Sequence, residues 1–312
     1  MAVLLRFAVL IPLIFSFVAF VLTNLTLFAG SKKGFMEEYA VVRINTTMLG
    51  QNLLSSDDKS SSDDDDDDGD SLWDQFTDGL DDLGDAAKGK INDIAGDIID
   101  DIADELGVSD WYSLHVMNAC WGGFGPNATT SHFQLNTTNC TQSAPQVRFN
   151  LTSLMDHQLS IGPLHISLAK IQWPSSIQRS VDALNAALMA LFVLYVLGVG
   201  FSGLAMLACI PAIVLGDKRI VLMINTGLAS AAAFFITLAS IIATAAGSVA
   251  VNAINKEGEP VTVVATNGTK FYTITWVTAT LMILSSAFWV GKFVFIWKKE
   301  KKERERYSKE GF

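Results

Sequence analysis

The chain has 312 residues, half of them hydrophobic, and a formal net charge of −10. Four stretches hold no Asp, Glu, Lys or Arg, which excludes an ordinary soluble domain, and the composition is too apolar for a disordered chain. These stretches are residues 7–31, 183–216, 220–255 and 271–291. Each is long enough to cross a bilayer as a helix, which takes about 20 apolar residues. The sequence therefore predicts a membrane protein with four spans.

The predicted spans divide the chain into alternating membrane and polar segments. We expect membrane helices at residues 7–29, 186–215, 220–251 and 272–297. Between and around them lie a short N-terminus (1–6), a long loop (30–185), a turn (216–219), a short loop (252–271) and a basic tail (298–312). Residues 31–185 contain 25 acidic and nine basic side chains. Such an acidic segment repels phosphate backbones, so nucleic acid is not an expected partner.

Glycosylation sequons and basic residues predict the same orientation. A glycan is added to an N-x-S/T sequon only on the lumenal side. Apart from Asn24, too near the end of the first span, the sequons fall in the two loops that four spans place on one side: Asn45, Asn127, Asn136, Asn139, Asn150 and Asn267. The tail holds Lys298, Lys299, Lys301 and Lys302, which by the positive-inside rule favour the cytoplasm. We therefore expect outer loops and cytoplasmic termini.

The first apolar run has an alternative interpretation as a cleaved signal peptide, which would leave three spans. Its apolar run exceeds the usual hydrophobic region of a signal peptide. Leu27 or Phe28 also occupies the position where cleavage would require a small residue. A first membrane helix is therefore favoured.

The long loop contains an acidic stretch after a mixed apolar and polar segment at residues 35–50. Residues 55–82 form an acidic low-complexity segment around the run Asp63–Asp68, which indicates a solvated linker. A calcium site is the alternative, but the Gly and Glu that an EF-hand loop requires are missing. Residues 83–106 place isoleucines at intervals of three or four among aspartates, typical of an acidic amphipathic helix. This helix either packs on the loop domain or binds a partner.

Residues 111–174 form a cysteine-containing module. Cys120 and Cys140 lie in one loop, and in an oxidising compartment they predict a disulfide, with reactive thiols as the alternative. Closing a loop of this length stabilises the fold by roughly 3 kcal/mol. The four histidines have no metal-ligand spacing, so no metal site is predicted. Residues 147–173 alternate loosely between apolar and polar, which favours strands or a hairpin.

The spans carry small residues rather than ionisable ones. Gly198, Gly200 and Gly203 match the letters of a dinucleotide fingerprint, but that loop must follow a strand in water. Gly198, Ser202 and Gly203 are instead expected to let helices pack closely in the bilayer. Cys209 is a candidate for palmitoylation or for plain packing. The prediction is an all-α membrane protein: a four-transmembrane-helix bundle with a large disulfide-stapled extracellular loop between helices 1 and 2.

No catalytic constellation or cofactor site is visible, and no span carries a charge at its centre. Enzymatic activity is therefore not expected. A transporter or channel subunit is a weaker alternative, because a polar residue within a span would have to carry the flux.

Several short motifs carry a family resemblance. They are residues 27–31 (LFAGS), 34–37 (GFME), 45–47 (NTT), 111–115 (WYSLH) and 173–174 (WP). With the order of one span, a glycosylatable two-cysteine loop, three clustered spans and a basic tail, the chain resembles the fungal SUR-seven/PalI family over essentially its whole length. That family is likened to claudins through a loop tryptophan and cysteine pair. The resemblance maps these onto Trp111 or Trp121, Cys120 and Cys140.

One departure from the family pattern concerns glycines. The family's loop motif tends to place them just before the first cysteine, whereas Gly122 and Gly123 follow it here. Which tryptophan is equivalent therefore stays open at this point.

The resemblance implies a role in organising membrane rather than in catalysis. Members of the SUR-seven branch mark immobile plasma-membrane domains associated with eisosomes and influence the cortex, endocytosis and wall integrity. PalI-branch members assist an ambient-pH-sensing receptor and often have a long cytoplasmic tail, so this short tail favours the first branch. The expected partners are eisosome components, laterally associated membrane proteins or further copies of the chain, and anionic inner-leaflet lipid on the tail lysines.

Overall fold

The computed structural model describes residues 8–49, 107–125, 134–143, 149–161, 168, 173–216 and 218–310, with side chains to residue 306. The expected acidic linker (55–82), the expected amphipathic helix (83–106) and Asn127 lie outside the described residues. The described chain divides into two compact units. One contains residues 8–28, 189–244 and 269–310, and the other contains the described parts of 29–188 and 245–268.

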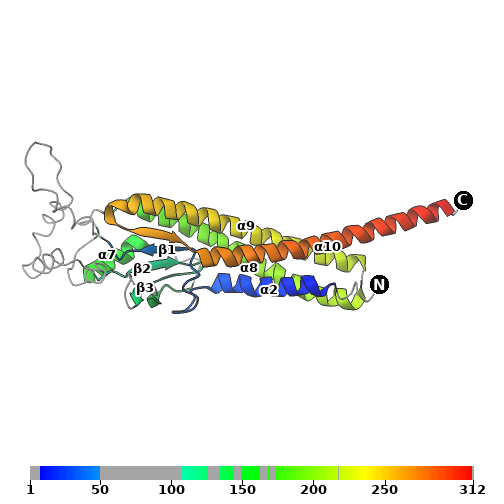
Figure 1. The fold of residues 1–312 in the computed structure, drawn as a ribbon, viewed down its shortest axis with the longest axis horizontal. Coiled ribbons are helices and arrows are strands. Elements are labelled where there is room, and N and C mark those ends of the chain that lie inside the picture. The colour runs from blue at the N-terminus through cyan, green and yellow to red at the C-terminus, as the bar shows by residue number, and fades with distance from the viewer. Residues whose placement is uncertain are drawn as a thin grey trace, which may run out of the picture. The chain divides into compact units, whose positions relative to one another are not determined.

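Four described helices are long and apolar enough to cross a membrane. They are α2 (Leu10–Phe28), α8 (Ser175–Leu215), α9 (Arg219–Gly258) and α10 (Thr269–Glu310), shown in Figure 1. The last three extend past the apolar runs of the sequence, because polar residues at their ends continue the same helix. In particular, α10 includes the tail lysines.

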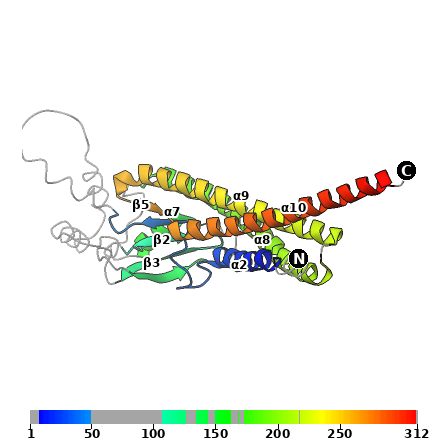
Figure 2. The same cartoon turned by 45° about the vertical axis from the view of Figure 1, so that its right-hand side comes forward.

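The first unit is a helical bundle with a core of small side chains. α2 and α10 lie side by side in it (Figure 2). One buried cluster contains mostly alanines with two larger residues: Ala19, Ala232, Ala233, Ile236, Ala279 and Met282. A second cluster surrounds Trp289 and includes Cys209. Small side chains let helix backbones approach closely, which is how helices associate in lipid.

Buried hydroxyl groups connect the helices of this bundle. Tyr195 Oη and Thr275 Oγ1 are 2.7 Å apart, and Thr275 Oγ1 is 2.6 Å from Ser240 Oγ. This chain of hydroxyls joins α8, α10 and α9. Ser16 Oγ on α2 is 3.3 Å from Ser285 Oγ on α10. Hydrocarbon offers polar groups no partner, so these hydroxyls on α2, α8, α9 and α10 take theirs from a neighbouring helix.

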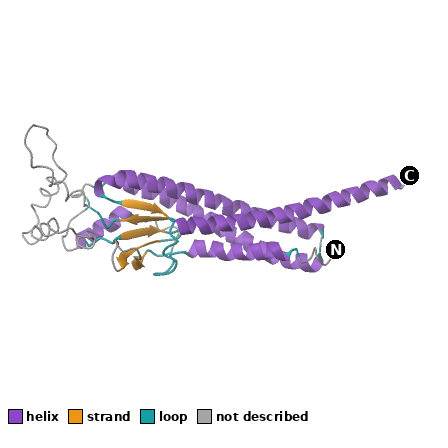
Figure 3. Ribbon diagram, viewed as in Figure 1, coloured by secondary structure: helices purple, strands orange, loops and turns teal. Residues whose placement is uncertain are grey.

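The second unit contains a five-stranded antiparallel sheet, drawn in orange in Figure 3. Its strands are β1 (Val42–Asn45), β2 (Trp111–Leu114), β3 (Ala119–Gly125), β4 (Gln134–Cys140) and β5 (Val264–Asn267), in the order β4-β3-β2-β1-β5. The expectation of an all-α protein was therefore wrong for this unit. The four-helix expectation agrees with the structure, and the sheet belongs to the second unit.

The sheet joins the two predicted loops. Residues of β5, from the chain between α9 and α10, pair with β1, so that Ile44 lies opposite Ala265. Gly268 permits this join, because a Cβ atom at Gly268 would collide with the Ala40 carbonyl oxygen. Every residue of β2 is buried, with no alternation to reveal a strand. Short strands that pair across the whole chain leave little local signal.

The expectation of strands in residues 147–173 was wrong where the structure describes them. Leu151–Ile161 is the helix α7. Leu151, Met155 and Leu159 are buried at intervals of four, which is the helical period. Asn150 Oδ1 accepts a hydrogen bond from the Ser153 amide at 2.8 Å and so caps the first turn. The loose alternation that favoured strands omitted Met155 and this cap.

Candidate functional site

The predicted disulfide is confirmed and lies across two neighbouring strands. Cys120 on β3 stands directly opposite Cys140 on β4 in the strand register, with their Cα atoms 4.0 Å apart. Cys120 is fully buried. The alternative of two reactive thiols is excluded in this structure. The bond pins β4, whose other side has no neighbour in the described sheet, to the rest of the sheet.

The segment that follows α2 packs against this disulfide. Gly30 has a φ of +71°, the left-handed region that favours glycine, and a Cβ there would meet the His115 ring. The Asn118 side-chain amide donates a hydrogen bond to the Gly30 carbonyl oxygen. That oxygen also lies 3.4 Å from Cys120 Sγ. A single backbone carbonyl therefore contacts both the disulfide and the turn that precedes β3.

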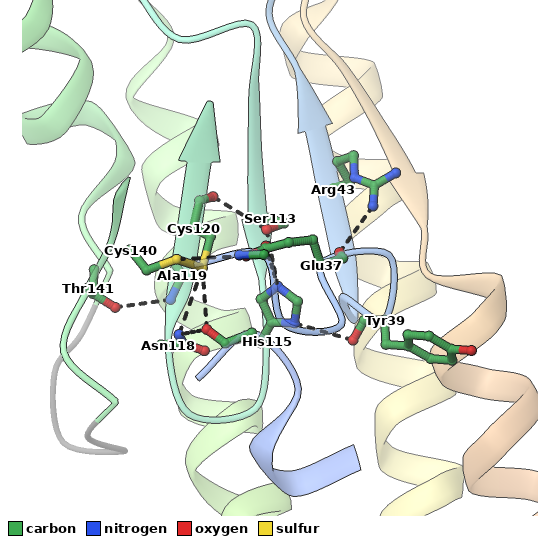
Figure 4. A network of polar contacts seen from close by, with 12 residues as sticks. Glu37, Tyr39, Arg43, Ser113, His115, Asn118, Ala119, Cys120, Cys140 and Thr141 are labelled. Atoms are coloured by element: carbon green, nitrogen blue, oxygen red, sulfur yellow. Dashed lines mark hydrogen bonds and ion pairs between the residues drawn. A yellow bond between two sulfur atoms is a disulfide. The ribbon is translucent and has the colours of Figure 1, made fainter. Parts of the chain in front are cut away.

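His115 is the centre of a buried polar cluster (Figure 4). Its Nε2 lies 3.7 Å from Glu37 Oε2 and 3.2 Å from Ser113 Oγ. Its Nδ1 lies 3.2 Å from the Tyr39 carbonyl oxygen. His115 is fully buried and Glu37 is 6% exposed. Both ring nitrogens thus have partners, and the imidazole fixes the 37–39 turn against β2.

Glu37 connects this cluster to neighbouring backbone. Its Oε1 accepts a hydrogen bond from the Gly34 amide at 3.0 Å, and its backbone oxygen accepts one from Arg43 Nη2 at 3.2 Å. Burial lowers the pKa of the Arg43 guanidinium, while the nearby carboxylates of Glu38 and Glu37 oppose that shift. A half-buried guanidinium and a buried carboxylate therefore both hold the backbone of residues 34–37.

Glu37, Cys120 and Cys140 also lie close enough together to resemble a metal-ligand group. The two sulfur atoms are bonded to each other, however, and it is the thiolate that ligates metal. Among the described residues, this group of Glu37 and the disulfide therefore stabilises the fold and does not form a metal centre.

The two candidate tryptophans have different surroundings. Trp111 is fully buried, and its Nε1 donates a hydrogen bond to the Gly123 carbonyl oxygen at 3.0 Å. Trp121 is half-buried and lines a pocket of about 300 Å³ with His157 and Phe149. Trp111 is thus the core tryptophan of the disulfide-pinned sheet, and Trp121 is a surface one.

Gly122 and Gly123 lie where β4 and the buried Asp110 approach β3. A Cβ at Gly122 would collide with the β4 backbone, next to the irregular register between Trp121 and Gly122. A Cβ at Gly123 would stand 3.1 Å from Asp110 Oδ2, which accepts the Phe124 amide at 2.7 Å. The glycines that follow the first cysteine therefore permit close strand pairing.

The sequon asparagines are distributed over the second unit. Asn136, Asn139, Asn150 and Asn267 are exposed, and Asn45 is half-buried with its Oδ1 bound to the Thr47 amide. Two of them, Asn136 and Asn139, lie on β4. The Asn139 sequon contains Cys140, so one acceptor site includes a disulfide cysteine.

The small residues of α8 face their own bundle. A Cβ at Gly198 would stand 2.7 Å from the Ile236 side chain, and one at Gly203 would stand 3.1 Å from Phe20. Ser202 is fully buried and its Oγ donates to the Val199 carbonyl oxygen. Gly200, by contrast, is exposed, and a Cβ there would meet nothing. Gly198 and Gly203 are therefore needed for close packing between helices of the same chain.

The tail lysines lie on a continuous helix. Lys298, Lys299, Lys301 and Lys302 are exposed on α10, and Lys299 Nζ lies 4.0 Å from Glu303 Oε1. A surface ion pair of this kind contributes roughly 0.3–0.5 kcal/mol. The helical tail presents its charges in every direction.

The sequence predicted no particular contact for Gly30, Glu37, His115 or Asn118, and indicated for His115 only a structural role. Gly30, Glu37 and His115 lie in the motifs that carry the family resemblance, but no spacing relates them, because their contacts span 76 or more positions in the chain. The hydroxyl chain of Tyr195, Thr275 and Ser240 was likewise not anticipated. The only sequence signal for this hydroxyl chain was the presence of polar residues within the apolar runs.

Four helices able to span a bilayer and a disulfide-pinned sheet define a multi-pass membrane protein with a structured loop domain. The chain belongs to the SUR7/PalI family, whose profile matches residues 8–288.

A relative from Schizosaccharomyces pombe (strain 972 / ATCC 24843), described as "SUR7 family protein pun1", is 26% identical over 201 residues. The match covers 63% of this chain and 66% of the relative, slightly less than two thirds of the relative's length. No solved structure matches the chain.

Proposed function

We propose that the protein is a non-enzymatic organiser of a plasma-membrane domain at the cell cortex, of the eisosome-associated kind, acting on cortex organisation, endocytosis and wall integrity. Membership of the SUR7/PalI family over residues 8–288 is the observation that carries the proposal. The charge-free centres of the four apolar runs also favour it, because ion or proton paths usually need ionisable groups there. The termini are cytoplasmic and both loops are outside.

The proposed mechanism is lateral contact between copies or with other membrane proteins. Because Gly198 and Gly203 are already packed against Ile236 and Phe20, the contacting surface must lie elsewhere on the bundle. Gly200 is an outward position where a neighbouring helix could approach closely. Gly200→Leu should therefore weaken clustering without unfolding the bundle, whereas Gly198→Leu should destabilise the bundle itself.

The tail adds attraction to anionic lipid. The expected fourth span ends at residue 297 and α10 rises about 1.5 Å per residue, so Lys298 to Lys302 lie within roughly 8 Å of the end of that span, about one Debye length. Basic groups this near a cytoplasmic leaflet contribute about 1 kcal/mol each. Glu300 and Glu303 reduce the net attraction.

Live imaging of the full chain, fused at its C-terminus to a fluorophore in a fungal cell, tests the proposal. We expect static surface patches with slow recovery after photobleaching. Changing Lys298, Lys299, Lys301 and Lys302 to Gln should speed recovery. The matched control neutralises four loop-side lysines, Lys32, Lys33, Lys256 and Lys270, and should leave recovery unchanged.

Other imaging outcomes contradict parts of the proposal. Unchanged recovery in the tail variant would remove the tail from the mechanism. A diffuse surface signal would contradict domain organisation. An endosomal signal that depends on a pH-sensing receptor would instead favour the role of a PalI-like accessory.

A further inference from the structure

A groove separates the N-terminal turns of α8 from the C-terminal turns of α9. It has a volume of about 540 Å³. Its α8 wall carries Ser176, Arg179, Ser180 and Leu184, and its α9 wall carries mainly alanines and Val249, ending at Glu257. Ala246, Ala250 and Ala253 follow at intervals of three or four, so they share one face of α9. Their short side chains leave the space that a larger residue would fill.

The groove is polar at one end only. Ser176 Oγ donates a hydrogen bond to Glu257 Oε2 at 2.8 Å, which places the start of α8 beside the end of α9. Arg179 lies on the same turn of α8, exposed, and has no hydrogen bond or ion pair with any described residue. From there the lining is apolar along both helices. The site therefore has one charged end and one hydrocarbon-like end.

The position of the groove along the sequence indicates which molecules reach it. Ala183, Leu184 and the α9 alanines lie inside the charge-free runs 183–216 and 220–255, whereas Arg179 and Glu257 lie just beyond those runs. The boundary between apolar and charged sequence is where membrane helices leave the hydrocarbon. A lipid at that depth has its head group level with charged residues and its chains level with the alanines.

The charges of the groove select among lipids. A neutral sterol offers no charged partner to the exposed Arg179 guanidinium, and a lipid whose only charge is a phosphate would face the Glu257 carboxylate. A zwitterionic head group satisfies both, because its phosphate accepts from the guanidinium and its ammonium donates to the carboxylate. None of the described lining residues is aromatic, so a quaternary choline would lack the ring cage that usually binds it.

We propose that this groove binds one phospholipid with a phosphoethanolamine head group, its phosphate on Arg179, its primary ammonium on Glu257 and one acyl chain along Ala246 to Ala253. The groove follows α9 for about 18 Å at 1.5 Å per residue, long enough for a head group and the upper part of a chain. The site is independent of whether the protein organises a membrane domain, because binding needs only one copy of the chain.

Native mass spectrometry of the full-length protein, purified and delipidated in detergent, tests the site. Phosphatidylethanolamine and phosphatidylcholine with identical acyl chains are the two probes. We expect one phosphatidylethanolamine to be retained, with about a tenfold preference over phosphatidylcholine, as expected for a charge-assisted hydrogen bond. Arg179→Gln and Glu257→Gln should each lower the affinity about tenfold.

Two further pairs of variants separate binding from folding. Ala246→Leu fills the groove and should abolish retention, whereas Ala186→Leu, at an exposed α8 alanine outside the groove, should not. Lys256→Gln removes an exposed charge beside the groove and should leave affinity unchanged. Equal binding of the two lipids would overturn the proposal, as would unchanged retention in both Arg179→Gln and Ala246→Leu. Displacement of the bound phospholipid by an equal concentration of sterol would also overturn it.

Discussion

Gly30 lies face to face with the imidazole ring of His115: a Cβ atom on Gly30 would stand 2.5–2.7 Å from three ring atoms. The Gly30 carbonyl oxygen in turn accepts the Asn118 amide and touches Cys120 Sγ. The segment after α2 is therefore fixed to β2 and β3 through a residue with no side chain. This contact makes the loop domain sensitive to a single methyl group.

Gly30→Ala should destabilise the loop domain by about 2–4 kcal/mol, because the new methyl group adds both left-handed strain and a clash with His115. Gly34→Ala is the matched control, since Gly34 has a φ of +77° but open space around its Cβ position. Gly34→Ala should lose only the stability that the left-handed backbone strain costs. Thermal unfolding of the purified proteins in detergent measures both, and equal losses in the two variants would show that the His115 contact contributes nothing.

Cys120→Ser should misfold the loop domain and reduce delivery to the cell surface. The bond closes a 20-residue separation, and its loss removes roughly 3 kcal/mol in the chain-entropy model. Cys140→Ser should have the same effect. Cys209 is not part of the disulfide, so Cys209→Ala should leave mobility on a non-reducing gel unchanged. Normal surface delivery of both disulfide variants would indicate that the bond is dispensable for folding.

Glycan occupancy at Asn139 should rise when the disulfide cannot form. Asn139 on β4 pairs with Trp121 on β3, and its Oδ1 accepts the Cys140 amide, so closing the disulfide holds this sequon in a sheet. Cys120→Ser frees β4 while leaving the sequon intact. Glycopeptide mass spectrometry should show higher occupancy at Asn139 and unchanged occupancy at Asn267. A parallel rise at both sites would point to slower folding in general.

Tyr195→Phe should lower the stability of the helical bundle by about 0.5–1.5 kcal/mol, the range for interhelical hydrogen bonds in membranes. The phenol is fully enclosed by the bundle, 2.7 Å from Thr275 Oγ1. Thr275→Val should cost more, because Ser240 loses a partner too. Thr280→Val is the control, since that hydroxyl bonds only within its own helix. Thermal melts in detergent rank the variants, and a ranking with Thr280→Val lowest in stability would refute the interhelical role.

The candidate site was visible from sequence only in part. Cys120 and Cys140 could be paired because two cysteines in one oxidised loop have few alternatives. Glu37, Gly30 and His115 could not be connected, because each contact depends on strands that bring distant segments together. Trp111 and Trp121 looked equivalent in sequence, and only burial distinguished them.

α7 shows a different reason for a missed element. The helical period of α7 extends over only 11 residues and rests on Leu151, Met155 and Leu159. So short a period is easily missed beside a loose alternation of apolar and polar residues. The cap at Asn150 was a usable signal, since asparagine favours this position. The same asparagine begins a glycosylation sequon, so its side chain fits two interpretations in the sequence.

The sequence by itself determined the four membrane helices, because burying a backbone in hydrocarbon demands long charge-free runs that composition alone reveals. Only the tertiary structure decided that the loops form one sheet, since β1 and β5 pair across more than 200 residues and each strand is too short to carry a period of its own. The lock between Gly30 and His115 and the groove between α8 and α9 are likewise tertiary. Both features depend on how closely two backbone segments approach each other, and the packing of segments distant in sequence sets that separation.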